Sequence, residues 1–364
     1  MAGNTTGTVF RVTTFGESHG LAIGGVVDGC PAGISFDTGV IRYELGRRKA
    51  NSELHSTTRH EMDEPRILSG IFEGKTTGAP IAFMIVNKAH DPGAYHQLRD
   101  AYRASHGDYG WHMKYGHFDH RGGGRYSARE TAARVVAGAI ARQLLAHYGI
   151  TVQGWVSGIG NIQLDGYGPY TSAEVEASTL RCPDSDVAKA MMSELEAAFI
   201  EKDTLGGLVS CVVNGVPAGL GEPVFDKVES ELAKAMMSIP AVKGFEMGSG
   251  FKASTMRGTA HNDPFNTDEQ GAVVTTTNHA GGTLGGIASG NPVCFRVAFK
   301  PVSSVKRKEE TITHDKKKRV IDLTGGRHDV CVVPRAVPVV EAMAAIVFAD
   351  LILRNRSARI KQNL

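Results

Sequence analysis

The chain has 364 residues, and its 40 basic and 38 acidic side chains leave a net charge of +2. A hydrophobic content of 41% and a charged content of 21% are typical of a globular protein with a large core. The near-neutral balance argues against nucleic acid or a membrane surface as the main partner. Five widely spaced cysteines form no CxxC pair, so we expect reduced thiols rather than disulfides or a zinc ribbon.

The first part of the chain is predicted to alternate strands with one short helix. The expected elements are strands at 8–14, 21–28 and 80–87 and a helix at 38–48. Thr38 is the expected N-cap of that helix. The polar, glycine-containing segment 16–20 separates the first two strands and is predicted to be a loop.

The clearest helix runs over 128–147, because Val136, Ile140 and Leu144 recur four residues apart on one face. Ser127 is the expected N-cap, and Glu130 would complete a capping box. Pro338 is expected in the first turn of the last helix. The other predicted elements are helices at 185–200, 224–237 and 338–353 and strands at 151–157, 207–214 and 293–299. With no linker and no internal repeat, this order predicts one α+β domain over 1–364.

The segment 114–131 concentrates groups that bind anions. Its sequence, KYGHFDHRGGGRYSARET, combines three arginines with three consecutive glycines and leads into the predicted helix. Arginine binds phosphate and carboxylate through paired hydrogen bonds, and glycine lets the backbone approach a ligand. A helix N-terminus adds free N–H groups. The segment therefore predicts a site for a strongly anionic ligand.

Three polar loops carry candidates for proton transfer. His19 lies beside Glu17 and Ser18, His106 precedes Asp108 by two residues, and Asp329 follows a glycine–arginine–histidine run. Each imidazole or carboxylate could donate or accept a proton. Each also has a structural alternative, a turn residue for the histidines and an ion pair for the aspartate, and local sequence leaves these alternatives open.

Other motifs favour or argue against specific classes of ligand. The segment 300–304, KPVSS, offers an ammonium and two hydroxyls that suit a phosphate group. The segment 281–286, GGTLGG, does not fit a dinucleotide fingerprint, and no P-loop occurs. The basic run 306–319 contains acidic residues and no aromatic ones, so a solvated loop or hairpin is expected there.

The cluster of His112, His117, Asp119 and His120 matches no metal-binding spacing, and no metal is predicted. The first twenty residues have no apolar h-region, and no run reaches the length of a membrane span. We therefore expect a soluble, cytoplasmic protein.

Taken together, these segments resemble the chorismate synthase family over almost the whole chain. GESHG at 16–20 with the following LAIGGVVDGCPAG resembles the first family signature. GGGRYSARETAARVVAGAIA at 122–141 resembles the second, and GRHDVCVVPRAVPVVEAM at 326–343 the third. Further matches are FEGKTTGAPI, GVPAGLGEPVFDK, MSIPAVKGFE, NHAGGTLGGIASG and KPVSS.

The resemblance implies a reaction and a fold. Such enzymes convert 5-enolpyruvylshikimate 3-phosphate into chorismate and phosphate by an anti-1,4-elimination, and they require reduced FMN without net oxidation. NADPH serves some relatives as the reductant, whereas others depend on an external source. The implied fold is a β-α-β sandwich with inner antiparallel sheets and outer helices, assembled as a homotetramer.

The resemblance also implies roles for individual residues. His19 would protonate or steady the departing phosphate, and Ser18 would support that region. His106 would lie near the anionic reduced flavin. Asp329 would take part in removing the C6 proton together with the flavin.

Arg48 would contact the substrate anions, and Arg129 is a second candidate for that role. The implied FMN contacts are Arg125, Tyr126, Ser127, Pro240, Ala241, Gly285, Lys300, Pro301, Val302, Ser303, Ser304 and Arg327.

Two of the chain's departures from the family pattern remove charged groups. Leu54 stands where the family has a second arginine, and the segment 87–95 lacks the usual arginine and acids. A lost arginine–anion contact would cost on the order of 1.5–3 kcal/mol. The alternative function is therefore a diverged, catalytically weak paralogue that binds FMN or anions.

Overall fold

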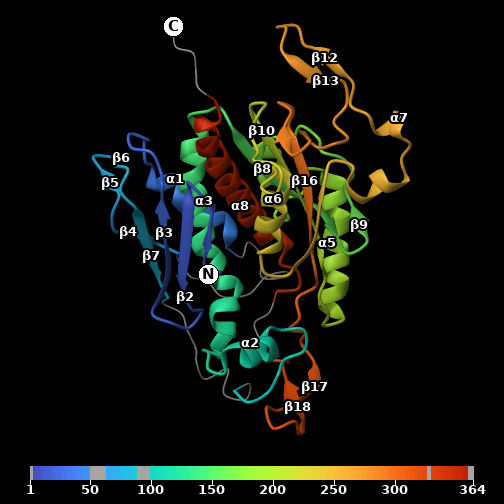
Figure 1. Cartoon of the computed structure of the whole chain (residues 1–364). Coiled ribbons are helices and arrows are strands. Elements are labelled where there is room, and N and C mark those ends of the chain that lie inside the picture. The colour runs from blue at the N-terminus through green and yellow to red at the C-terminus, as the bar shows by residue number, and fades with distance from the viewer. Residues whose placement is uncertain (1–2, 50–62, 88–98, 326–328, 360–364) are drawn as a thin grey trace.

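A computed structural model describes residues 3–49, 63–87, 99–325 and 329–359. Two five-stranded antiparallel sheets dominate it, with strand orders β1-β2-β3-β7-β4 and β11-β16-β10-β8-β9 (Figure 1). The first sheet comprises β1 (Thr5–Thr6), β2 (Arg11–Gly16), β3 (Ala22–Asp28), β4 (Pro65–Ile67) and β7 (Ile81–Val86). The second comprises β8 (Thr151–Ile159), β9 (Ile162–Gln163), β10 (Gly207–Asn214), β11 (Val242–Met247) and β16 (Val293–Phe299).

The helices that fill the core lie between the two sheets. Those of this middle layer are α1 (Thr38–Arg48), α3 (Thr131–Ala146), α6 (Val228–Met237) and α8 (Val333–Arg354). Helix α3 packs on β3 of the first sheet, α8 packs on β8 and β10 of the second, and the two helices pack on each other (Figure 1). The α+β class and the antiparallel sheets are confirmed.

The order of the layers differs from the expected inner sheets and outer helices. The reason is that α8 is apolar on all sides and must be enclosed, whereas each sheet needs only one covered face. One contiguous cluster of buried apolar residues joins both sheets to the middle layer.

The remaining elements lie around this sandwich. Helix α5 packs against β8 and β9. Helix α2 and the hairpin β17–β18 form one end of the molecule, and the hairpin β12–β13 projects from the opposite end (Figure 1). The helices and strands outside the two large sheets and the middle layer are α2 (Asp108–Tyr115), α4 (Ser172–Ala177), α5 (Ser185–Ile200), α7 (Gly258–His261), β5 (Ile71–Phe72), β6 (Lys75–Thr76), β12 (Phe265–Thr267), β13 (Val273–Thr275), β14 (Thr283–Leu284), β15 (Ile287–Ala288), β17 (Lys308–Ile312) and β18 (Lys318–Asp322). Short 3-10 turns cover η2 (Arg121–Tyr126), η3 (Ala128–Glu130), η4 (Gly250–Thr255) and η5 (Asn355–Ser357).

Several elements begin at a different residue than predicted, in most cases because a side chain forms hydrogen bonds with the backbone groups there. The strand expected at 8–14 begins at Arg11, since the N–H groups of residues 8–10 all donate to Asp350 Oδ1 at 2.6–2.9 Å. The N-cap of α1 is Asp37 and not Thr38, because Asp37 Oδ1 accepts from the Gly39 N–H at 2.7 Å. The helix expected at 224–237 begins at Val228, since residues 222–226 form a two-residue bridge.

The start of α3 confirms the predicted cap and corrects the capping box. Ser127 Oγ accepts from the Arg129 N–H at 3.4 Å, and a 3-10 turn precedes the α-helix. Glu130 does not return to the cap. Its carboxylate accepts from Thr14 Oγ1 at 2.7 Å and from Arg134 Nε at 2.8 Å, which ties the helix to β2.

Helix α8 begins five residues earlier than predicted, with Pro334 in the first turn and Pro338 inside the helix. A proline there leaves the carbonyl of residue 334 without its helical donor. Arg181 Nη1 fills that position and donates to the Pro334 carbonyl at 2.7 Å. By length and hydropathy the run Val333–Ser357 would pass for a membrane span, contrary to the sequence expectation, but that window is wholly buried inside the protein.

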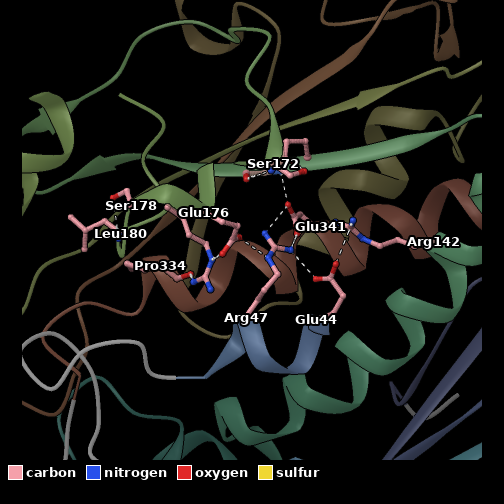
Figure 2. Close-up of polar contacts among 12 residues, drawn as sticks. Glu44, Arg47, Arg142, Ser172, Glu176, Ser178, Leu180, Pro334 and Glu341 are labelled. Atoms are coloured by element: carbon pink, nitrogen blue, oxygen red, sulfur yellow. Dashed lines mark hydrogen bonds and ion pairs between the residues drawn. The ribbon is translucent and has the colours of Figure 1, made fainter. Parts of the chain in front are cut away.

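A buried ionic network crosses the middle layer (Figure 2). Glu341 of α8 lies at its centre and is 1% exposed. It pairs with Arg47 of α1 and, at 2.9 Å, with Arg142 of α3, and it accepts from the Gly154 N–H of β8 at 2.7 Å. The whole network consists of Glu44, Glu176 and Glu341 with Arg47, Arg142 and Arg181. Three positive charges therefore meet three negative charges.

Candidate functional site

The loop that carries Ser18 and His19 lies against the glycine turn η2. Both side chains are buried, and the Ser18 N–H donates to the Gly124 carbonyl at 3.1 Å. A Cβ on Gly122 would stand 2.5 Å from the His19 imidazole and 3.1 Å from Ser18 Oγ. Gly122 also has a φ of +57°, so the position favours glycine on both grounds. The first and second signature segments therefore meet at His19.

Asn87 connects this loop to Arg129. Its amide nitrogen donates to the carbonyls of Glu17 and Gly20 at 3.1 and 2.8 Å, and its oxygen accepts from Arg129 Nε at 3.0 Å. One side chain thus fixes both the histidine loop and an arginine of the candidate anion site.

Three arginines converge next to this loop. Arg48 donates to Thr131 Oγ1 and to the Ala128 carbonyl, both at 2.9 Å, and lies 3.4 Å from Asp63. Arg129 pairs with the other oxygen of Asp63. Burial, together with the charges of Arg335 and Arg129, lowers the pKa of Arg48 to about 9. The like charges are close enough to disfavour one another, which is the condition that an anionic ligand relieves.

Asp329 lies at the edge of the same arginine cluster. Arg335 Nη1 donates to both of its carboxylate oxygens, at 3.0 and 2.8 Å. Arg335 Nε donates to the main-chain carbonyl of Arg48 at 3.2 Å. Asp329 therefore does form an ion pair, which was its structural alternative, but the partner, Arg335, belongs to the candidate anion site.

His106 meets the KPVSS segment. Its Nδ1 contacts the Ala104 carbonyl at 2.9 Å and its Nε2 contacts Ser304 Oγ at 3.1 Å. Burial, with the charges of Arg103 and Lys300, lowers the pKa of His106 to about 4. The imidazole is therefore neutral at pH 7. A carbonyl can only accept, so the proton resides on Nδ1 and Ser304 donates to Nε2.

The other members of 300–304 are held close to this histidine. Ser303 Oγ and Lys300 Nζ both donate to the Ser105 carbonyl, at 3.1 and 3.3 Å. The Lys300 N–H donates to the Ala241 carbonyl at 2.9 Å, which places Pro240 and Ala241 at the same strand end. Pro301 is exposed and Val302 accepts a hydrogen bond from Thr204 at 2.8 Å.

Two predicted FMN contacts are already bonded to protein groups. Tyr126 donates to Asp108, which Arg103 holds through two bonds of 2.9 and 2.8 Å. Arg125 donates to the carbonyl and the hydroxyl of Thr14, both at 2.7 Å. In this structure both side chains brace the glycine turn, and Ser127 caps the helix.

Gly285 lies apart from these groups in the hydrogen-bond network of the described residues. Gly285 lies in the turn between β14 and β15, where hydrogen bonds lead to Leu220 and Val228 rather than to Lys300 or His106. Arg327, like Leu54, lies outside the described residues. Their expected roles stay predictions.

Sequence reasoning missed three residues of this site: Asp63, Asn87 and Arg335. Arg335 stands inside the third signature, six residues after Asp329, and that spacing was the available signal. Asn87 is the first residue of the altered family segment 87–95 but was given no role there, and Asp63 belongs to no motif, so the roles of both emerge from their contacts with Arg129.

The histidine cluster at 112–120 and the basic run 306–319 take other roles in the structure than a metal or nucleic-acid site. No group of histidine, cysteine, aspartate or glutamate residues suited to a metal ion occurs in the described ranges. His112 instead contacts the Tyr102 hydroxyl at 2.7 Å and stacks near His314. The basic run forms the hairpin β17–β18, as expected. All five cysteines are buried free thiols.

The His106 group and the arginine cluster differ in chemistry. Asp329 and Ser304 line one small cavity together with Lys306, so the aspartate and the His106 group share a space. The donor set at His106 fits a phosphorylated, electron-rich ring such as a flavin: an ammonium, two hydroxyls and an imidazole kept neutral. The arginine cluster suits a second, strongly anionic molecule beside it.

Comparisons with known proteins agree with this geometry. The Chorismate synthase family model matches residues 10–353. Chorismate synthase of Cytophaga hutchinsonii is 52% identical over 98% of this chain and 99% of its own length, and that of Christiangramia forsetii is 51% identical over 99% and 100%. A solved structure described as a crystal structure of chorismate synthase aligns with a TM-score of 0.75 and 31% identity, covering 96% of this chain and 93% of its own. The sandwich, the three convergent signatures and these matches show that the chain belongs to the chorismate synthase family of lyases.

Proposed function

We propose that this enzyme converts 5-enolpyruvylshikimate 3-phosphate into chorismate and phosphate and requires reduced FMN. The C6–H bond and the C–O bond to phosphate break, and the electron pair of the former becomes a new carbon–carbon double bond. The substrate carries one phosphate and two carboxylates. The single observation that carries the proposal is the convergence of Arg48, Arg129 and Arg335, whose positive charges lie close enough for Arg335 and Arg129 to help lower the pKa of Arg48.

In this proposal the arginines bind and orient the substrate. Arg48 and Arg129 are each fixed by protein acceptors on one side, so little side-chain entropy is lost when an anion arrives. A fixed array of positive charges also stabilises the negative charge that collects on the departing phosphate. Family membership and the charge excess both support this role.

FMN would be held at the strand end that carries His106. Lys300 and Ser303 suit its phosphate, and neutral His106 with Ser304 suits the ring. Bound reduced FMN would supply the electron density that phosphate departure needs. The Nδ1–H of His106 is taken by the Ala104 carbonyl, so uptake of a proton at Nε2 would provide the donor for an anionic ring, an adjustment that a permanently charged side chain cannot make.

Two groups of the chain would manage protons. His19 is buried against Gly122 and is held near the arginine cluster through Asn87, so it is placed to protonate or steady the leaving phosphate. Ser18 packs at the same point of η2. The Asp329 carboxylate, fixed by Arg335, is assigned to removal of the C6 proton.

The finer properties of the family belong to the same proposal. We infer a homotetramer in the cytoplasm, and an external reductant for FMN because the sequence has no dinucleotide fingerprint. NADPH as the direct reductant is the alternative, and turnover with NADPH in place of a chemical reductant would support it. A catalytically weak paralogue remains the second candidate function because of Leu54 and the segment 87–95.

Anaerobic turnover tests the function directly. The protein is mixed with 5-enolpyruvylshikimate 3-phosphate and photoreduced FMN, and phosphate release and chorismate absorbance are followed together. Equal amounts of the two products are expected. Absence of both products with intact, folded protein would reject the lyase and favour the paralogue.

Gly122→Ala tests whether the glycine turn positions His19, with Gly149→Ala as its matched control. Both glycines have positive φ, +57° and +68°, but a Cβ on Gly149 meets nothing within 4 Å. Both variants should lose about 1 kcal/mol of stability from the left-handed backbone. Only Gly122→Ala should also lower kcat, by about tenfold or more, because it displaces the imidazole. Equal kcat values for the two variants would contradict the role given to His19.

A further inference from the structure

Arg335 joins the candidate proton acceptor to the candidate anion site. Its Nη1 donates to both oxygens of Asp329, at 3.0 and 2.8 Å, and its Nε donates to the Arg48 carbonyl at 3.2 Å. The two paired side chains are 23% and 13% exposed, so both are largely shielded from water. The Arg335 guanidinium therefore fixes the Asp329 carboxylate relative to the last turn of α1, which carries Arg48.

Helix stability does not explain an arginine at this position. Arg335 lies in the first turn of α8, where the helix end carries partial positive charge. A cation there is unfavourable by about 0.3–1 kcal/mol. Arg335 also stands close enough to Arg48 for their charges to oppose each other. The favourable contacts that offset these costs are the two bonds to Asp329 and the bond to the Arg48 carbonyl.

We propose that Arg335 is a positioning residue for proton removal: it holds the Asp329 carboxylate in one orientation and at a fixed offset from the substrate arginines. This inference rests on the proposed function. Because Arg335 Nη1 donates to both oxygens, the carboxylate is held in one orientation relative to the guanidinium. Misplacement of a reacting group by about 1 Å can cost about 100-fold in rate, so such a constraint has a large kinetic effect.

A direct role in substrate binding is the competing explanation. Within the described residues, Arg335 Nη2 has no hydrogen-bond partner, so it could donate to a substrate anion. The two roles predict different kinetics. A positioning residue acts through Asp329 and changes kcat, whereas a substrate ligand acts independently of Asp329 and changes affinity.

The experiment combines Arg335→Gln, Asp329→Asn and the double variant in a mutant cycle. Arg354→Gln is the matched control, since it removes another α8 arginine that pairs with an aspartate, Asp226 at 2.8 Å. Anaerobic turnover with reduced FMN gives kcat and KM, and a substrate deuterated at the C6 proton gives the isotope effect. Calorimetric titration of the undeuterated substrate into protein with oxidised FMN measures affinity without turnover, and thermal melting reports folding.

For Arg335→Gln we expect kcat to fall by at least about tenfold while the titrated Kd stays within about threefold. The isotope effect should rise, because proton removal becomes slower than the other steps. Adding Arg335→Gln to Asp329→Asn should change kcat by less than about twofold, since the positioned group is already absent. Arg335→Lys should retain more activity than Arg335→Gln, and Arg354→Gln should keep wild-type kcat.

Three results would overturn the inference. A wild-type kcat and isotope effect in Arg335→Gln would remove any role in proton transfer. A Kd raised about tenfold or more, both alone and with Asp329→Asn, would make Arg335 a substrate ligand instead. Absence of turnover in the wild-type protein would overturn the proposed function and this inference with it, whereas normal wild-type turnover with either of the first two results overturns the inference alone.

Discussion

Arg47 and Arg48 are neighbours in α1, but they enter two differently charged surroundings. Arg47 joins the buried network around Glu341, where three arginines meet three glutamates (Figure 2). Arg48 joins Arg129 and Arg335, and within the described residues these three arginines form ion pairs with Asp63 and Asp329. Balanced charge completes a fold, whereas a local excess of one sign is stable only where a ligand of the other sign binds. The difference separates a structural arginine from a ligand-binding one.

The largest effect expected from this comparison is on stability, in Arg47→Met. The substitution keeps an unbranched stem but removes the guanidinium, which leaves Glu44 and Glu341 short of a partner in the core. Breaking a buried ion pair from one side costs about 3–5 kcal/mol. Urea unfolding measures this loss, with Lys189→Gln as control because its pair with Asp186 is exposed and worth at most about 1 kcal/mol. A loss below about 1 kcal/mol for Arg47→Met would show that the network is dispensable.

Arg48→Met should change substrate affinity more than it changes stability. It removes one of three crowded positive charges, so we expect a stability change smaller than about 1 kcal/mol. Substrate affinity should fall by about 10- to 100-fold, as expected for loss of a charged hydrogen bond of about 1.5–3 kcal/mol. Titration of 5-enolpyruvylshikimate 3-phosphate and urea unfolding are measured on the same preparations. A variant that binds normally but unfolds easily would place Arg48 with Arg47 among the structural residues.

The smallest effect concerns His106, where burial and the charges of Arg103 and Lys300 lower the pKa from 6.5 to about 4. Between these values the unfolded chain binds the proton and the folded protein does not, so acidification favours unfolding. This contribution is complete above pH 6.5 and is lost as the pH falls toward 4. Wild-type protein should therefore lose more stability over that range than His106→Asn. Parallel pH–stability curves for the two proteins would contradict a neutral, buried imidazole.

The sequence predicted most elements because their periodicity is local. The strands at 207–214 and 293–299 and the helix at 185–200 occur at the predicted residues. The boundaries that moved did so through distant side chains: Asp350 takes the N–H groups of residues 8–10, and Arg181 takes the carbonyl that lets Pro338 lie inside a helix. No local pattern reveals a partner more than a hundred residues away.

The candidate site likewise contains residues that local sequence identifies and residues that only tertiary contacts reveal. Ser18 and His19 were identified from the first signature, Asp329 from the third and His106 from a polar loop, and the structure joins His106 to Ser304 and places Asp329 on the same cavity as Ser304. Asp63, Asn87 and Arg335 were missed because their importance lies in the pairs they form. The layer order was also missed, since whether a helix covers a sheet or separates two sheets depends on which faces are left to bury.

The wholly enclosed helix α8 has a consequence for biosynthesis. It follows both sheets in the chain, and it packs on β8, β10, α3 and α1. While the ribosome is still adding residues 333–354, the inner face of the second sheet and the side of α3 that faces it lack the helix that covers them, and folding can be completed only after that segment emerges. Nascent chains of this protein should therefore depend on chaperones to shield exposed apolar surface until synthesis is nearly finished.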